Sequence, residues 1–139
     1  MSSSPQVALQ LALTNRLFFY TPLTQLLPNR NMGATPYADA NLYLPYVLIA
    51  DVVSRPLGTQ THIAHECDVT CEVYSTSPGG GEARRLLERV ADAFEASLAV
   101  AGQRVILQQG NIAQVVLMSD GKTYRGTYRL RIILEDEGV

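Results

Sequence analysis

The chain has 139 residues, of which 47% are hydrophobic, and a formal net charge of −2. This length suits one domain with one core, and the composition excludes a disordered chain. The slightly negative net charge argues against a protein whose main function is to bind nucleic acid, although it is compatible with a local basic patch.

The first predicted element is a helix over residues 5–20, because Ser4 suits the N-cap and Pro5 the first helical position. Pro22 ends this helix, and residues 23–27 form one more turn. The apolar face of the helix over residues 5–20 is predicted from near-helical spacing. It consists of Val7, Ala8, Leu11 and Phe18, and it is widened by Leu9, Leu13 and Leu17. No apolar run approaches the roughly 18 residues of a membrane span, and no basic segment suggests a signal peptide.

Two strands are predicted next, at residues 46–53 and 63–74, after an irregular segment at 29–45 and around a polar loop at 54–61. The second strand alternates, which indicates one buried and one solvent-facing side. Its predicted inner side carries Ile63, His65, Cys67, Val69, Cys71 and Val73. Its predicted outer side carries the acidic residues Glu66, Asp68 and Glu72.

The C-terminal half predicts a helix over residues 81–99 and strands over 104–118 and 123–135. Asp120 and Gly121 between these strands are a strong hairpin signal. The last strand also alternates: Tyr124, Gly126, Tyr128, Leu130, Ile132 and Leu134 are predicted to face inward, and its outer face carries Arg125, Arg129 and Arg131.

These elements predict an α+β fold formed by a single domain, residues 1–139. Its sheet would be antiparallel and four-stranded, made of two hairpins that flank the long central helix. The N-terminal helix and the central helix would pack on one face. The other face would carry both charged rows and meet water or another subunit.

A metal site, a disulfide, a phosphate-binding loop and a nucleophilic triad are each weighed and set aside. His62, His65, Cys67 and Cys71 lack a second ligand cluster, so core packing is preferred to metal binding. The two cysteines lie about 13 Å apart in a strand, too far for a disulfide, which suggests a reducing compartment. Glycines 79–81 lack the P-loop ending, and no catalytic triad or serine elbow is present, so neither an enzyme nor a cofactor is expected.

The most distinctive feature is the row Arg125, Arg129 and Arg131. Period-two spacing puts these side chains on one face of one strand. They could form an ordinary solvated face paired with Glu66, Asp68 and Glu72, or a surface that meets another subunit or nucleic acid. Spacing alone does not decide between these interpretations.

Several segments together resemble the tail completion, or tail terminator, proteins of long-tailed phages and of phage-derived gene transfer agents. The matching segments are residues 21–27 (TPLTQLL), 44–49 (LPYVLI), 65–75 (HECDVTCEVYS), 82–98 and 120–131 (DGKTYRGTYRLR). The pattern is spread over most of the chain and includes no invariant catalytic string. Whether the chain comes from a phage or a gene transfer agent stays open.

The resemblance implies a structural protein of the particle, made in the bacterial cytoplasm and located at the tail–head junction. Such proteins form a ring, typically a hexamer, which stops polymerisation of the tail tube and joins the tail to the head connector. The implied partners are further copies of the chain, the tail tube protein and the head–tail connector protein, with DNA passing through the lumen. The alternatives are a connector or tube component, or a small nucleic-acid-binding module.

Overall fold

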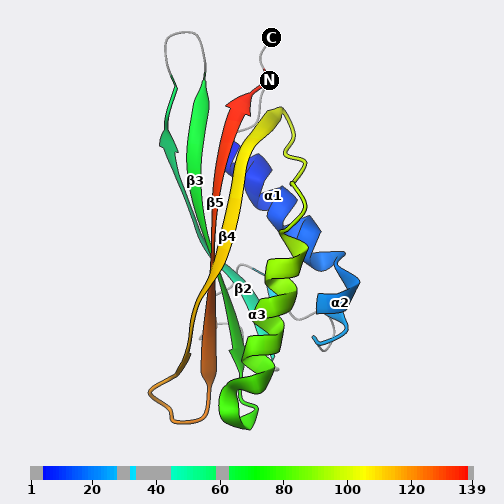
Figure 1. Ribbon diagram of the computed structural model, residues 1–139, viewed down its shortest axis with the longest axis vertical. Helices are drawn as coiled ribbons and strands as arrows, with labels where there is room; N and C mark the ends of the chain where they lie inside the picture. Colours follow the sequence, from blue (N-terminus) through cyan, green and yellow to red (C-terminus); the bar gives the residue numbers. More distant parts are fainter. Residues whose placement is uncertain (1–4, 28–31, 34–44, 59–62, 138–139) are drawn as a thin grey trace.

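The computed structural model describes residues 5–27, 32–33, 45–58 and 63–137. In chain order the elements are α1 (Pro5–Phe18), α2 (Thr21–Thr24), β1 (Met32–Gly33), β2 (Tyr46–Pro56), β3 (Ala64–Ser75), the 3₁₀ turn η3 (Pro78–Gly80), α3 (Gly81–Ala93), β4 (Gln103–Leu117) and β5 (Tyr124–Asp136). The three α-helices lie on one side of a long, twisted sheet (Figure 1). His62 and most of the predicted irregular segment lie outside the described residues.

The sheet is mixed and five-stranded, in the order β1-β2-β3-β5-β4. The α+β class is confirmed, but the prediction of a purely antiparallel four-stranded sheet is wrong. The extra strand is β1, which pairs in parallel with the start of β2. It has only two residues and lies in a segment rich in Asn, Gly and Pro, where no alternation could reveal it.

Alternation in the two central strands is confirmed. Cys67, Val69 and Cys71 of β3 are buried with Leu130 and Ile132 of β5 in one core. The helices contribute Leu9, Leu13 and Leu17 from α1 and Leu86, Leu87 and Val90 from α3. Both main helices therefore cover one sheet face, as predicted. Ile63 differs from the prediction, since it is 59% exposed and precedes β3.

The buried face of α1 differs from the predicted one. Val7 and Leu11 are each 61% exposed, whereas Ala8 at the same end of the helix is buried. The sequence has apolar residues around most of this helix, so spacing did not show which stripe would face the core. Val7 and Leu11 therefore form an exposed apolar pair, one turn apart, on the outer side of α1.

Helix α3 ends at Ala93, six residues before the predicted end. Arg16 of α1 donates to the carbonyls of Ala93 at 2.7 Å and Ala96 at 2.9 Å. Gln108 of β4 donates to the Phe94 carbonyl at 2.7 Å and to that of Ala96 at 2.9 Å. These bonds satisfy backbone carbonyls that a longer helix would have used internally. Their donors lie far away in the sequence, so local pattern could not place the helix end.

The β4–β5 connection is the tight turn predicted from Asp120 and Gly121. One Asp120 carboxylate oxygen accepts from the backbone N–H groups of Lys122 and Thr123, both at 2.9 Å. The other accepts from the Thr123 hydroxyl at 2.6 Å. Gly121 has φ +72°, a left-handed conformation that other residues rarely adopt. These bonds lower the pKa of Asp120 to about 2, with the Thr123 hydroxyl as the largest cause.

Candidate functional site

The charged residues predicted for the outer sheet face lie together there. Strands β3 and β5 are antiparallel neighbours, and Asp68 lies opposite Arg131 while Thr70 lies opposite Arg129. The acidic row on β3 and the arginine row on β5 are therefore side by side, on the face away from the helices. This adjacency follows from strand order, which the sequence patterns did not contain.

Glu66 is at the centre of an ion-pair network across three strands. Arg131 of β5 donates from Nε to a Glu66 carboxylate oxygen at 2.6 Å. Arg55 of β2 binds the other oxygen of Glu66 and also lies 2.8 Å from an Asp68 carboxylate oxygen. Hydrogen bonds from Arg55, followed by those from Arg131, lower the pKa of Glu66. The network ties β2, β3 and β5 together on their outer face.

Arg55 was missed because residues 54–61 were predicted to be a loop. Strand β2 instead continues to Pro56, and Arg55 pairs in register with Glu66. Pro56 and Gly58 suggested a loop, but a proline at the end of a strand is compatible with pairing. The available signal was the period-two spacing of Val53 and Arg55, which places both residues on the outer face, opposite Asp68 and Glu66.

Arg125 is held in a different way at the other end of the row. Its Nε lies 3.9 Å from a Glu72 carboxylate oxygen, which is beyond hydrogen-bonding distance. This Nε is buried and has no hydrogen-bond partner. Glu72 instead accepts a hydrogen bond from the Tyr74 hydroxyl at 2.8 Å. Arg125 is thus close to a countercharge but weakly bound to it.

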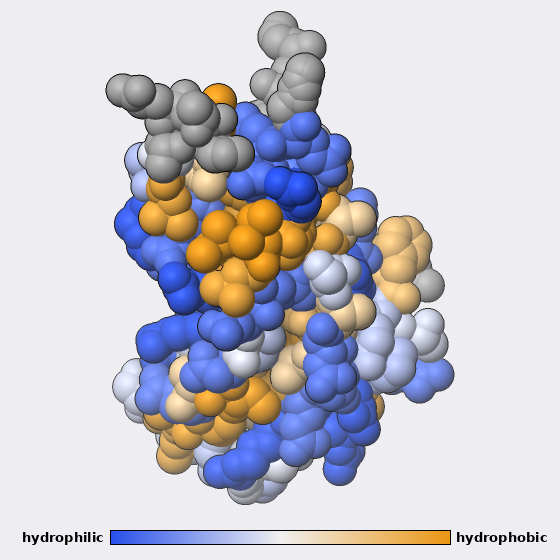
Figure 2. All heavy atoms as spheres, turned by 45° about the horizontal axis from the view of Figure 1, so that its top comes forward, coloured by the Kyte–Doolittle hydropathy of each residue, from blue (hydrophilic) through white to orange (hydrophobic). Residues whose placement is uncertain are grey.

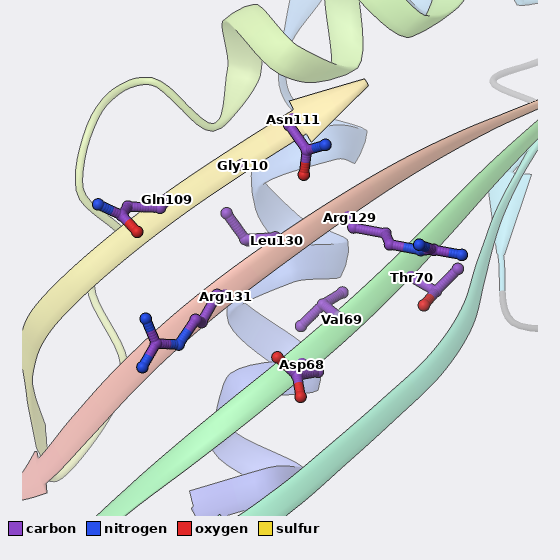
Figure 3. Close-up of a pocket in the computed structure, with 9 residues that line it drawn as sticks. All are labelled: Asp68, Val69, Thr70, Gln109, Gly110, Asn111, Arg129, Leu130 and Arg131. Atoms are coloured by element: carbon purple, nitrogen blue, oxygen red, sulfur yellow. The ribbon is translucent and has the colours of Figure 1, made fainter. Parts of the chain in front are cut away.

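Arg129 differs from its two neighbours in the row. Within the part of the chain that the structure describes, it makes no ion pair. It borders an open hollow of about 830 Å³ whose polar lining includes Thr70, Gln109 and Asn111. Figure 3 shows its side chain reaching from β5 across β3 towards Thr70. The guanidinium is therefore available to an incoming acceptor.

The outer sheet face carries equal numbers of positive and negative side chains. The registers of β2 to β5 place five arginines and five carboxylates on it: Arg55, Arg104, Arg125, Arg129 and Arg131, with Asp51, Glu66, Asp68, Glu72 and Glu135. Nonspecific nucleic-acid binding depends on an excess of positive charge over a surface. A balanced face is better suited to directional contacts with another protein surface.

The remaining residues considered from the sequence belong to the core or to turns. Cys67 and Cys71 are free, and both are completely buried. Burial raises the pKa of Cys71 to about 12 and is the main cause of the raised pKa of Cys67. Glycines 79 and 80 form the turn between β3 and α3. Over the described residues, no three His, Cys, Asp or Glu side chains are grouped to hold a metal ion, and no helix has the length and apolarity to cross a membrane.

Comparison with known proteins agrees with the sequence resemblance. The family model described as tail completion protein gp17 matches residues 12–135. A chain from the virion of a native gene transfer agent particle has the same fold, with a TM-score of 0.84 at 21% identity, covering 96% of this chain and 99% of that one. The gp17 protein of bacteriophage SPP1 matches with a TM-score of 0.58 at 26% identity, covering 91% and 88%. A comparison with curated protein sequences found no match. The chain belongs to the tail completion protein gp17 family and is a structural component of a phage-type tail.

Proposed function

We propose that this single-domain protein forms a ring, most simply a hexamer, that caps the head-proximal end of the tail tube. The ring ends tube polymerisation and provides the surface that joins the tail to the head connector. DNA passes through its lumen without being recognised. The observation that carries the proposal is the match to the tail completion family over residues 12–135.

The outer sheet face suits this role. Arg55, Glu66 and Arg131 form a fixed intramolecular network, whereas Arg129 is exposed and has no ion pair within the described chain. A surface of this kind can set the register of a neighbouring subunit through a few directional contacts. Exposed pairs stabilise by only about 0–1 kcal/mol each, so most of the affinity must come from apolar contact elsewhere.

Charge balance also bears on how DNA would meet the ring. A lumen that binds phosphates tightly would hold DNA in place, whereas ejection requires the DNA to slide. The five arginines and five carboxylates of the outer face offset each other. If this face lines the lumen, it presents no net positive surface. The same balance disfavours the alternative of a nucleic-acid-binding module.

The test is polymerisation of the purified tail tube protein with and without this chain. We expect added protein to stop tube growth at one end, and electron microscopy to show a ring at that end only. When particles are assembled without the protein, the tails should be overlong and should not be joined to heads. Incorporation along the whole tube would instead identify a tube component, and binding only to isolated heads would identify a connector component.

A further inference from the structure

Strand β4 forms an edge of the sheet and carries no charge over most of its length. In the described sheet it pairs only with β5, so its other side is unpaired. Residues 105–118 contain no Asp, Glu, Lys, Arg or Pro, although the chain has 24 charged residues, 11 basic and 13 acidic. Exposed edges are normally protected from pairing by charges, prolines or short length. β4 has 15 residues.

Apolar side chains are exposed along this edge. Ile106 is 53% exposed, Ile112 is 44% exposed and Leu117 is 52% exposed. Every residue from 109 to 114 is exposed. The register shifts at Ile106 and Ala113 show two bulges, which bend the strand but add no charge. Figure 2 shows hydrophobic residues gathered into patches between hydrophilic ones on the face turned towards the viewer.

A groove runs beside this edge, between β4 and the first turns of α3. It has a volume of about 280 Å³, with Leu87, Ile112 and Val115 as its apolar lining. Arg84 and Glu88 of α3 also line it. Protein interfaces commonly combine an apolar centre with a polar rim. The groove and the edge together form one continuous contact surface, called here the β4 surface.

A second apolar surface, which carries no charge, lies on α1, towards the opposite edge of the sheet. Helix α1 packs against β2, and Gln6 donates to the Val52 carbonyl at 2.5 Å. Outside β2 the described sheet has only the two residues of β1. Val7 and Leu11, one turn apart, are each 61% exposed. The only charged residue of α1 is Arg16, which donates to carbonyls of the same chain.

A closed ring needs two different surfaces on opposite sides of each subunit, which meet head to tail. Burying a charge against an uncharged surface is costly. The uncharged part of β4, residues 105–118, is therefore best matched by another uncharged surface, with the exposed Arg84 and Glu88 at the polar rim. We propose that the β4 surface of one copy receives the exposed face of α1, with Val7 and Leu11, from the next copy. This inference rests on the proposed ring and specifies its seam.

Complementation between two variants tests the seam directly. Ala113→Lys places a charge on an exposed bulge of β4, and Leu11→Lys places one on exposed α1. Gln25→Lys, an exposed change on neither surface, is the matched control. Size-exclusion chromatography with light scattering, with and without purified tail tubes, measures assembly. Circular dichroism and thermal melts confirm that each variant folds.

We expect each lysine variant alone to lose ring formation, while Gln25→Lys assembles like the wild type. An equimolar mixture of Ala113→Lys and Leu11→Lys should form dimers and nothing larger. The intact α1 face of the Ala113→Lys copy binds the intact β4 surface of the Leu11→Lys copy, and the other two surfaces of the dimer are both disrupted. Rings formed by either variant alone would overturn the proposed seam but leave the ring in place. Wild-type protein that stays monomeric even on tubes would overturn the ring, and the seam with it.

Discussion

Arg131 and Glu66 form a hydrogen-bonded ion pair across β5 and β3, with Nε 2.6 Å from the carboxylate oxygen. The Glu66 side chain is only 13% exposed, and Arg55 binds it from the other side. Arg129, two residues earlier on the same strand, has no such partner within the described residues. Neighbouring arginines of one row therefore have different roles: one fixes three strands together, and the other is free to contact a partner.

Glu66→Gln is expected to lower the urea midpoint of unfolding, and Arg129→Gln is expected to leave it almost unchanged. A neutral amide cannot balance Arg131, and Arg55 would then keep Asp68 as its remaining countercharge in the network. The decrease in the urea midpoint caused by Glu66→Gln should be smaller in 1 M NaCl, where the screening length is only about 3 Å. Equal midpoints for both variants would show that the network adds nothing to stability.

DNA binding should be weak, because the outer face has no excess of arginine. Fluorescence anisotropy with a labelled duplex of random sequence is expected to show no binding at physiological salt. The double variant Glu66→Gln and Asp68→Asn removes two carboxylates, and it should bind DNA with an affinity that falls steeply as salt rises. Tight binding by the wild type that disappears in Arg129→Gln would favour a nucleic-acid-binding role.

The two central strands could be predicted because alternation directly records which side is buried. Cys67 and Val69 of β3, like Leu130 of β5, are buried as that pattern indicated. The network around Glu66 could not be predicted in full, because it needs the strand order and an arginine from a segment that resembled a loop. The end of α3 depends on Arg16, a donor more than 70 residues away in the chain.

Asp120→Asn is expected to destabilise the protein at neutral pH and to have a smaller effect in acid. The folded pKa of about 2 lies below the unfolded value of about 3.9. This stabilisation is therefore fully present above about pH 4 and is lost as the pH falls towards 2. The difference in urea midpoint between the wild type and Asp120→Asn, followed from neutral pH to about pH 2, measures this stabilisation. Ser119→Ala in the same turn removes no carboxylate, so a pH-dependent difference there would contradict the assignment.

Gly126→Ala should destabilise the packing of α3 on the sheet. A Cβ at this position would lie 2.5 Å from Leu87 Cδ1 and 2.8 Å from Val73 Cγ2, well inside contact distance. Overpacking of this kind typically costs about 1–3 kcal/mol. Gly81→Ala is the matched control, because a Cβ there meets no atom within 4 Å and its backbone is helical. A Gly126→Ala protein as stable as the control would mean that the helix moves aside freely.

The buried thiols predict how the native protein reacts with thiol reagents. Cys67 and Cys71 are completely buried, and burial raises the pKa of both, that of Cys71 to about 12. Since the thiolate is the reactive form, we expect negligible labelling of the folded protein at pH 8 and labelling of both cysteines in urea. Gly126→Ala should speed native labelling by raising the open population, without changing the yield in urea. Rapid labelling of the wild type under native conditions would show that the β3 core opens far more readily than its packing implies.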